Sequence, residues 1–301
     1  MARSDDQGEV ALTFFLPPPE LKPFITAVYH MNVGGSGRGQ NSAVRDWLHP
    51  EWANLRVSTS GQLMAGIGTE DPQPMPRMVM TGPTSRTINF VAPPGRTWGI
   101  GILPLGWARL VDAAANLYAD RSVDVERDPA LAHLKPLGRL EDKAPLEEER
   151  DRIFAMLKPL LATPHRREDD IVRAQQALID PACATVAQLA QSLSMTTRTL
   201  ERFSCEAFGF SPQLLLRRQR FLRSLAQFML DPSMHWIDTL DPQYYDQSQF
   251  TRDFKRFMGM APRDYARLPH PVLGAAAHAR KAIVGEAVQV LHKPESAPDA
   301  D

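Results

Sequence analysis

The C-terminal part of the chain contains one pattern twice, as LERFSCEAFGFSP at 200–212 and as FTRDFKRFMGMAP at 250–262. Each copy is typical of a helix that ends at a glycine and is followed by a second helix that begins at a proline. Glycine adopts the left-handed conformation beyond a helix end easily, and proline fits the first helical position. Both copies place an arginine, Arg202 or Arg252, at the same point of the helix. The repeat predicts a duplicated helix-turn-helix that reads DNA.

The first copy is preceded by the signals of a tight helical turn. Thr185 and Gln188 have capping-box spacing, and Thr196 is placed to cap a helix over 197–208. The start of that helix carries three outward-facing candidate DNA contacts: Arg198, Glu201 and Arg202. A long helix over 212–230 then links the two motifs, and we expect most of its arginines to form a solvated face.

The second copy begins with a similar capping pair, Asp246 and Gln249, which opens a helix over 247–258. The exposed entrance of this helix carries four more candidate DNA contacts: Gln247, Ser248, Gln249 and Arg252. Glutamine can pair with adenine edges and arginine with guanine, while serine can contact bases or phosphates. Upstream, residues 236–240 suggest a short scaffold helix that an aspartate and a proline end early.

Residues 183–268 resemble the DNA-binding domain of AraC-type (AraC/XylS) transcriptional regulators, through the strings MTTRTLERF, AFGFSPQLLLRRQRF and YYDQSQFTRDFKRFMGMAPRDY. The resemblance implies seven helices that place two helix-turn-helix motifs in consecutive major grooves, and it puts the seven candidate contacts on DNA-facing positions. It also implies an N-terminal sensing or dimerising domain, frequently a cupin-like β-fold. The implied partners are double-stranded promoter DNA, with a small-molecule effector, RNA polymerase and a second copy of the chain as further candidates.

Two positions depart from the family pattern. The family usually has a core phenylalanine where this chain has Ser204, so the first motif is expected to pack in a slightly different register. The scaffold helix of the second motif normally ends in a glycine, where this chain has Asp241-Pro242-Gln243. That helix is therefore expected to be short, which leaves the first motif as the more dependable base reader.

The N-terminal half differs in composition, because proline and glycine are concentrated before position 106. Short apolar runs bounded by turn residues predict β-strands over 24–33, 54–58, 78–80, 87–92 and 97–103. Helical spacing follows over 106–118 and 145–161, and the charged stretch 126–143 is expected to be a loop. The strings FFLPPPELKPFI and WGIGILPLGWARL resemble sensory domains of some members of the family.

The predicted fold class is α+β, with a β-rich, cupin-like sensory domain followed by an all-α domain that holds two helix-turn-helix motifs. We expect four parts: a sensing or dimerisation domain at 1–125, a helical linker region at 126–170, an AraC-type DNA-binding domain at 171–270 and a tail at 271–301, with a helix over 275–291.

The tryptophans of the N-terminal half are the candidate lining of an effector pocket, with Trp52 and Trp98 named first. Core packing is the more common role for any single one of them. The histidines of this half show no paired spacing, so we predict neither a metal site nor another cofactor.

Composition limits the remaining choices. The formal charge of the 301 residues is −1, although 196–230 holds six arginines against two glutamates. Two cysteines, Cys183 and Cys205, cannot form a disulfide framework, which favours a reducing, cytoplasmic compartment. No secretory pattern and no membrane-length apolar run is visible, so a membrane partner is not expected.

Three functions fit the sequence, of which a DNA-binding transcription regulator without enzymatic activity is favoured. The modest basic charge leaves open an interaction module that has lost DNA binding. A DNA-repair alkyltransferase is the enzymatic alternative, because AraC-like domains are also attached to such enzymes. That chemistry needs an activated cysteine thiolate, and neither cysteine lies in a Pro-Cys-His-type motif.

Overall fold

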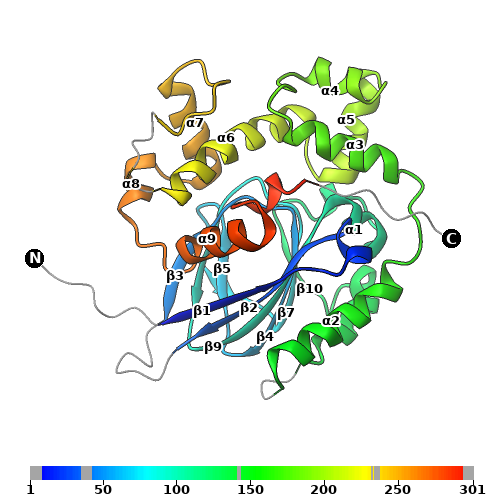
Figure 1. Ribbon diagram of the computed structural model, residues 1–301, viewed down its shortest axis with the longest axis vertical. Coiled ribbons are helices and arrows are strands. Elements are labelled where there is room, and N and C mark those ends of the chain that lie inside the picture. Colours follow the sequence, from blue (N-terminus) through cyan, green and yellow to red (C-terminus); the bar gives the residue numbers. More distant parts are fainter. Residues whose placement is uncertain (1–8, 35–42, 141–143, 232, 234–237, 294–301) are drawn as a thin grey trace, which may run out of the picture.

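The computed structural model describes residues 9–34, 43–140, 144–231, 233 and 238–293. An N-terminal antiparallel β-sheet region carries a C-terminal helical region on top of it (Figure 1). The predicted α+β class is therefore confirmed. Residues 236 and 237 of the expected scaffold helix over 236–240 lie outside the described residues, and 238–240 are not helical.

Two antiparallel sheets form the N-terminal region. The six-stranded sheet has the order β1 (Val10–Phe15), β2 (Ile25–Val33), β9 (Gly95–Ile102), β4 (Ala53–Ser60), β7 (Met78–Thr81) and β10 (Ser122–Asp124). The four-stranded sheet has the order β3 (Val44–Leu48), β8 (Ile88–Ala92), β5 (Met64–Ile67) and β6 (Gln73–Pro74). The five runs predicted as strands correspond to β2, β4, β7, β8 and β9, whereas β1, β3, β5, β6 and β10 were not predicted.

The central strand β4 shows how the sheet is covered on both faces. Residues 53–58 are all buried. Asn54 and Arg56 face a cavity between the two sheets, and the alternate residues Leu55 and Val57 belong to the apolar core. Because neighbouring side chains of a strand point to opposite faces, one strand serves both the core and the cavity.

Two predictions about the middle of the chain were wrong in detail. The helix α1 (Pro104–Leu110) ends before 118, because Val111 is extended and the Trp107 indole donates to the Ala113 carbonyl, fastening a turn. The expected loop 126–143 contains a 3₁₀ helix at Pro129–Gly138, capped by the Asp128 side chain. Its leucines recur every third residue, which matches the 3₁₀ period and buries one side. The helix α2 (Leu146–Leu160) follows and is confirmed.

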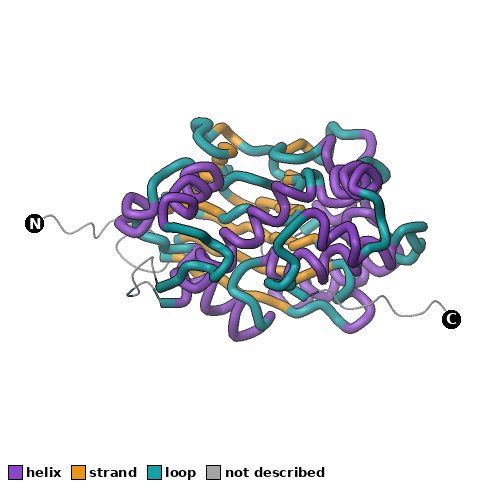
Figure 2. Tube along the Cα trace, turned by 90° about the horizontal axis from the view of Figure 1, so that it is seen from above, coloured by secondary structure: helices purple, strands orange, loops and turns teal. Residues whose placement is uncertain are grey.

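The helical region is organised around the long helix α6 (Pro212–Leu230). One end carries α3 (Glu168–Ile179), α4 (Val186–Ser192) and α5 (Thr197–Phe208), and the other carries α7 (Gln247–Met258) and α8 (Pro262–Arg267) (Figure 1). Seen from above, these helices lie across the strands (Figure 2).

The tail returns to the β-sheet region. Helix α9 (Leu273–Val284) packs against β1, β3 and α6 (Figure 1). The helix predicted over 275–291 is broken at Gly285, whose φ of 88° is left-handed. A 3₁₀ turn at Gln289–Leu291 follows and is buried.

Candidate nucleic-acid interface and ligand cavity

The first motif has the geometry of a helix-turn-helix. Thr185 and Gln188 form the reciprocal capping box of α4, in which the backbone N–H of Gln188 donates to Thr185 Oγ1 at 3.2 Å. Thr196 caps α5, and Gly209 ends it in the left-handed conformation. The candidates Arg198, Glu201 and Arg202 are all exposed. The Arg202 side chain is 73% exposed, and Glu206 reaches it only at 3.9 Å, so its guanidinium is available to a ligand in solution.

The second motif repeats this arrangement at α7, which Asp246 caps and Gly259 ends. Gln247, Ser248 and Arg252 are exposed. Gln249 differs, because its side chain is half-buried and its Oε1 accepts the backbone amide of Tyr245 at 3.1 Å. Tyr245 itself is 95% exposed beside the helix entrance, and a tyrosine in a turn carries no distinctive pattern in the sequence.

Most arginines of α6 do not form the solvated face that we expected. Arg217 and Arg220 both pair with Asp253 of α7, whose side chain is 1% exposed, and Arg223 pairs with Asp241. The Asp241 carboxylate also accepts the Gln243 amide at 2.9 Å, so the residue that departs from the family pattern fastens this turn to α6. The ion pairs join the second motif to the helix that links the two motifs, and they leave less free positive charge on the surface.

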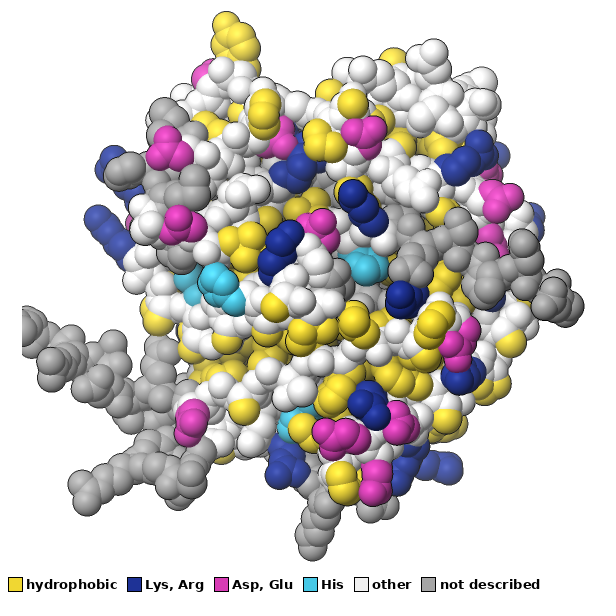
Figure 3. Space-filling model, viewed as in Figure 1, with side chains coloured by type: hydrophobic (Ala, Val, Ile, Leu, Met, Phe, Trp, Pro, Cys, Tyr) yellow, Lys and Arg dark blue, Asp and Glu magenta, His cyan; other side chains and the backbone are white. Residues whose placement is uncertain are grey.

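Both recognition helices contact the β-sheet region at their C-terminal ends. The Phe208 ring lies 5.7 Å from the Trp52 ring, and the Phe257 carbonyl accepts the Thr87 amide at 2.7 Å. Because the C-terminal ends are anchored, the N-terminal turns with the candidate DNA contacts point away from the sheets. The space-filling view shows acidic and basic side chains interspersed over the helical region (Figure 3).

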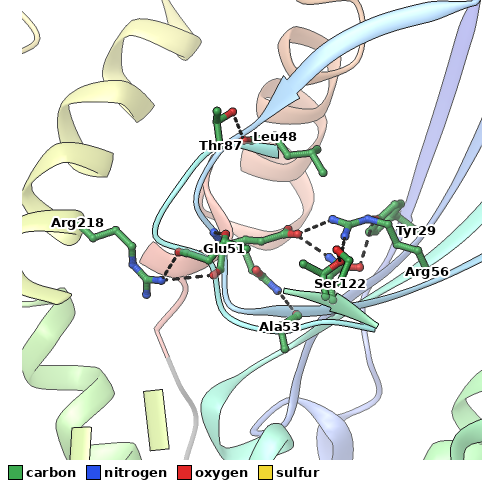
Figure 4. A network of polar contacts seen from close by, with 12 residues as sticks. Tyr29, Leu48, Glu51, Ala53, Arg56, Thr87, Ser122 and Arg218 are labelled. Atoms are coloured by element: carbon green, nitrogen blue, oxygen red, sulfur yellow. Dashed lines mark hydrogen bonds and ion pairs between the residues drawn. The ribbon is translucent and has the colours of Figure 1, made fainter. Parts of the chain in front are cut away.

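A buried arginine joins α6 to the sheets. Arg218 Nη1 donates to the carbonyls of Thr84 at 2.8 Å and Glu51 at 3.4 Å, and the guanidinium lies 4.1 Å from the Trp52 ring centroid (Figure 4). Burial lowers the pKa of Arg218 to about 9, so the group is still charged at neutral pH. Trp52, predicted to line an effector pocket, therefore lies at the contact between the two halves.

A cavity of about 150 Å³ lies between the two sheets and is lined on one side by the C-terminal tail. Side chains of both sheets line it, together with α9 and Val288 from the tail. Neither Trp52 nor Trp98 is among the lining residues, because Trp98 packs against Phe15 and His30 instead. The lining could not be recognised from the sequence, since it draws single residues from strands and a tail that are far apart in the chain.

Four polar side chains of the cavity form a cluster. Glu51 pairs with Arg56 at 2.5 Å and accepts from the Asn54 amide at 3.4 Å (Figure 4). Arg56 Nε also donates to the Tyr29 hydroxyl at 3.0 Å. Burial raises the pKa of Tyr29, which keeps this hydroxyl protonated. The cluster thus has two charges that neutralise each other.

Strand β3 and the segment after it bind the C-terminal helices directly. The buried Asp46 carboxylate accepts the amides of Val272 and Leu273 at 2.9 and 2.8 Å, which caps the start of α9. His49, which lines the cavity, contacts the Tyr265 hydroxyl of α8 at 2.8 Å. Burial lowers the pKa of His49 to about 4, so the ring is neutral at pH 7.

The described residues contain no group of three or more potential metal-binding side chains. Within the same residues, none of the helices is long and apolar enough to cross a membrane.

Comparison with known proteins gives one family match. Residues 189–268 match a family model described as a helix-turn-helix domain, and no curated protein matches the chain. Among solved structures, ToxT from Vibrio cholerae is 12% identical, with 75% of this chain and 97% of ToxT covered and a TM-score of 0.42. Wild-type ToxT of strain SCE256 bound to an unsaturated fatty acid is 10% identical, with 88% and 97% covered and a TM-score of 0.41. The AraC-like transcriptional activator CuxR is 11% identical, with 75% and 84% covered and a TM-score of 0.31. The family match and the two capped helices with exposed entrances identify residues 189–268 as a helix-turn-helix domain.

Proposed function

We propose that the chain is a ligand-responsive transcription regulator, which binds promoter DNA through α5 and α7 and senses a small molecule in the cavity between its sheets. The observation that carries DNA binding is the exposure of two equivalent helix entrances on one rigid helix. The proposed DNA contacts are Arg198, Glu201, Arg202, Gln247, Ser248 and Arg252, to which we add Tyr245.

Ligand control is supported by the place of the cavity. Its lining includes Glu51, whose carbonyl accepts from Arg218 of α6, and His49, which contacts Tyr265 of α8. A ligand that moves these residues changes how the DNA-binding domain rests on the sheets. Coupling then requires that the ligand prefer one arrangement of the two halves over another.

The alternative of alkyl transfer finds little support at the cysteines. Burial raises the pKa of both thiols, with Asp180 adding to the effect at Cys183 and Glu201 and Glu206 adding to it at Cys205. A raised pKa disfavours the thiolate that such a reaction needs. An interaction module without DNA binding is the second candidate. Three arginines of α6 form internal ion pairs, which leaves less positive charge for DNA phosphates. RNA polymerase and a second copy of the chain stay candidate partners.

The test is DNA binding by the full chain. Sites are selected from random duplexes, and affinity is measured against salt for the wild type, Arg202→Ala and Arg252→Ala. Each variant is expected to lose roughly 1–3 kcal/mol of binding free energy if its arginine reads a base. The control is Arg127→Ala, whose exposed side chain lies in the N-terminal half. Wild-type affinity in both variants would contradict the placing of these arginines at the DNA, whereas salt-insensitive binding or no selected site would favour the interaction module.

A further inference from the structure

The tail helix α9 places a buried cation in the cavity. Arg280 is 8% exposed and lines the cavity beside Tyr29 and Glu51. Its Nε and Nη2 atoms are buried, and neither has a hydrogen-bond partner within the described part of the chain. The guanidinium lies 6.0 Å from the Phe14 ring centroid, at the outer limit of a cation–π contact, which gives neither N–H group a hydrogen-bond acceptor. Burial lowers the pKa of Arg280 to about 10, so it is still charged at neutral pH.

The charges of the lining do not balance. Glu51 is the one carboxylate among the described lining residues, and it is already bound to Arg56. His49 is neutral, because its pKa is about 4. Glu286 acts on Arg280 electrostatically, but it lies outside the lining and forms no ion pair with Arg280 in the described structure. Two guanidinium groups therefore face one carboxylate, and a buried unpaired charge is costly.

The donor geometry indicates which anion would restore the balance. Nε and Nη2 are on the same edge of the guanidinium, and their two N–H bonds run parallel. A carboxylate accepts such a pair with both oxygens at once. The rest of the lining is mainly apolar and includes Leu12, Phe14 and Met31. A cavity of about 150 Å³ has held a benzene-sized molecule in another protein.

We propose that the cavity binds a small apolar carboxylic acid, whose carboxylate pairs with Arg280 and whose hydrocarbon part lies between the sheets. The inference rests on the proposed ligand-responsive function and names its ligand class. Because Arg280 follows the DNA-binding domain in the chain, the bound acid connects the sheets to the tail of that domain. The acid thereby favours the arrangement in which α9, held by Asp46, rests on the sheets.

The experiment measures direct binding to the full chain by calorimetry, without DNA. The probes are benzoate, hexanoate and octanoate, each compared with its neutral alcohol. We expect at least one acid to bind about tenfold or more tightly than its alcohol, since hydrogen bonds to charged groups are the stronger ones. Arg280→Met should remove this preference without lowering the affinity for the alcohol. Lys281→Met is the matched control, because it removes an exposed positive charge from the same helix.

The outcomes separate the ligand class from the proposed function. Equal binding of acid and alcohol to the wild type, a retained preference in Arg280→Met, or no binding of any probe would each overturn the inference. If Arg280→Met does not fold, Arg280→Lys serves in its place, and it should keep part of the preference because the charge remains. Acids that bind through Arg280 without changing DNA affinity would uphold the ligand class and contradict ligand control of DNA binding.

Discussion

Arg218 donates to the backbone carbonyl of Glu51, while the carboxylate of the same glutamate pairs with Arg56 inside the cavity. One residue thus contacts the linking helix with its main chain and the cavity with its side chain (Figure 4). A change in the cavity that moves Glu51 also moves the carbonyl oxygen that accepts a hydrogen bond from Arg218. Arg218 belongs to α6, the helix that links the two motifs. This contact is a physical connection between the two halves of the chain.

Replacing Arg218 by alanine should loosen the docking of α6 on the sheets. The variant loses both hydrogen bonds and the contact with the Trp52 ring, so the backbone around Thr84 should open more often. Hydrogen exchange should become faster at residues 84–87 and stay slow in the central strands β2 and β9. Gln227→Ala, an exposed change on the same helix, is the control. Unchanged exchange at 84–87 would mean that other contacts hold the interface.

The neutral His49 predicts a loss of stability in mild acid. Its pKa is about 4 in the folded chain and about 6.5 when unfolded. Between these values the unfolded chain binds a proton that the folded chain does not, so stability falls as pH decreases from about 6.5 to about 4. Over the whole interval, His49 lowers the free energy of unfolding by on the order of 3 kcal/mol.

This loss is measured as the change in Tm between pH 7 and pH 5. His49→Gln keeps a polar partner for Tyr265 but does not titrate, so the variant should lose less stability than the wild type over this interval. Other groups titrate equally in both proteins and cancel in the comparison. A variant that responds to pH as the wild type does would show that His49 is not the source.

The helix-turn-helix motifs were predictable because their determinants are local. A cap, an apolar stripe and a left-handed glycine lie within each segment, as in Thr196 to Gly209. Residues close together in the sequence therefore determine where each helix begins and ends. The α6 arginines were misjudged because their partner Asp253 is on another helix, and Arg280 was missed because its surroundings come from strands over 200 residues away. Contacts of that kind leave no periodic signal in the sequence.

Gln249 and Gln247 should behave differently although both stand at the entrance of α7. Gln249→Ala removes the acceptor of the Tyr245 amide, so it should lower the free energy of unfolding by about 1 kcal/mol. Gln247→Ala should leave stability unchanged, because the side chain is exposed, and weaken specific DNA binding. Thermal unfolding and DNA affinity of both variants separate the two roles. A strong DNA defect without a stability change in Gln249→Ala would return this residue to the DNA contacts.

Three glycines in the left-handed conformation permit a graded test of how the recognition helices rest on the sheets. At Gly285 an added Cβ meets nothing within 4 Å, so Gly285→Ala reports the backbone strain alone, about 1–2 kcal/mol. At Gly259 the Cβ would lie 3.1 Å from a Thr69 methyl, which can shift. At Gly209 it would lie 2.6 Å from the rigid Pro83 ring, so this variant should lose a further 1–3 kcal/mol, roughly, through overpacking. Thermal unfolding should therefore rank the variants in the order Gly285, Gly259 and Gly209, with the last least stable. Adding Pro83→Ala to Gly209→Ala should recover part of the loss, and equal destabilisation by all three single variants would contradict a close contact between α5 and the sheets.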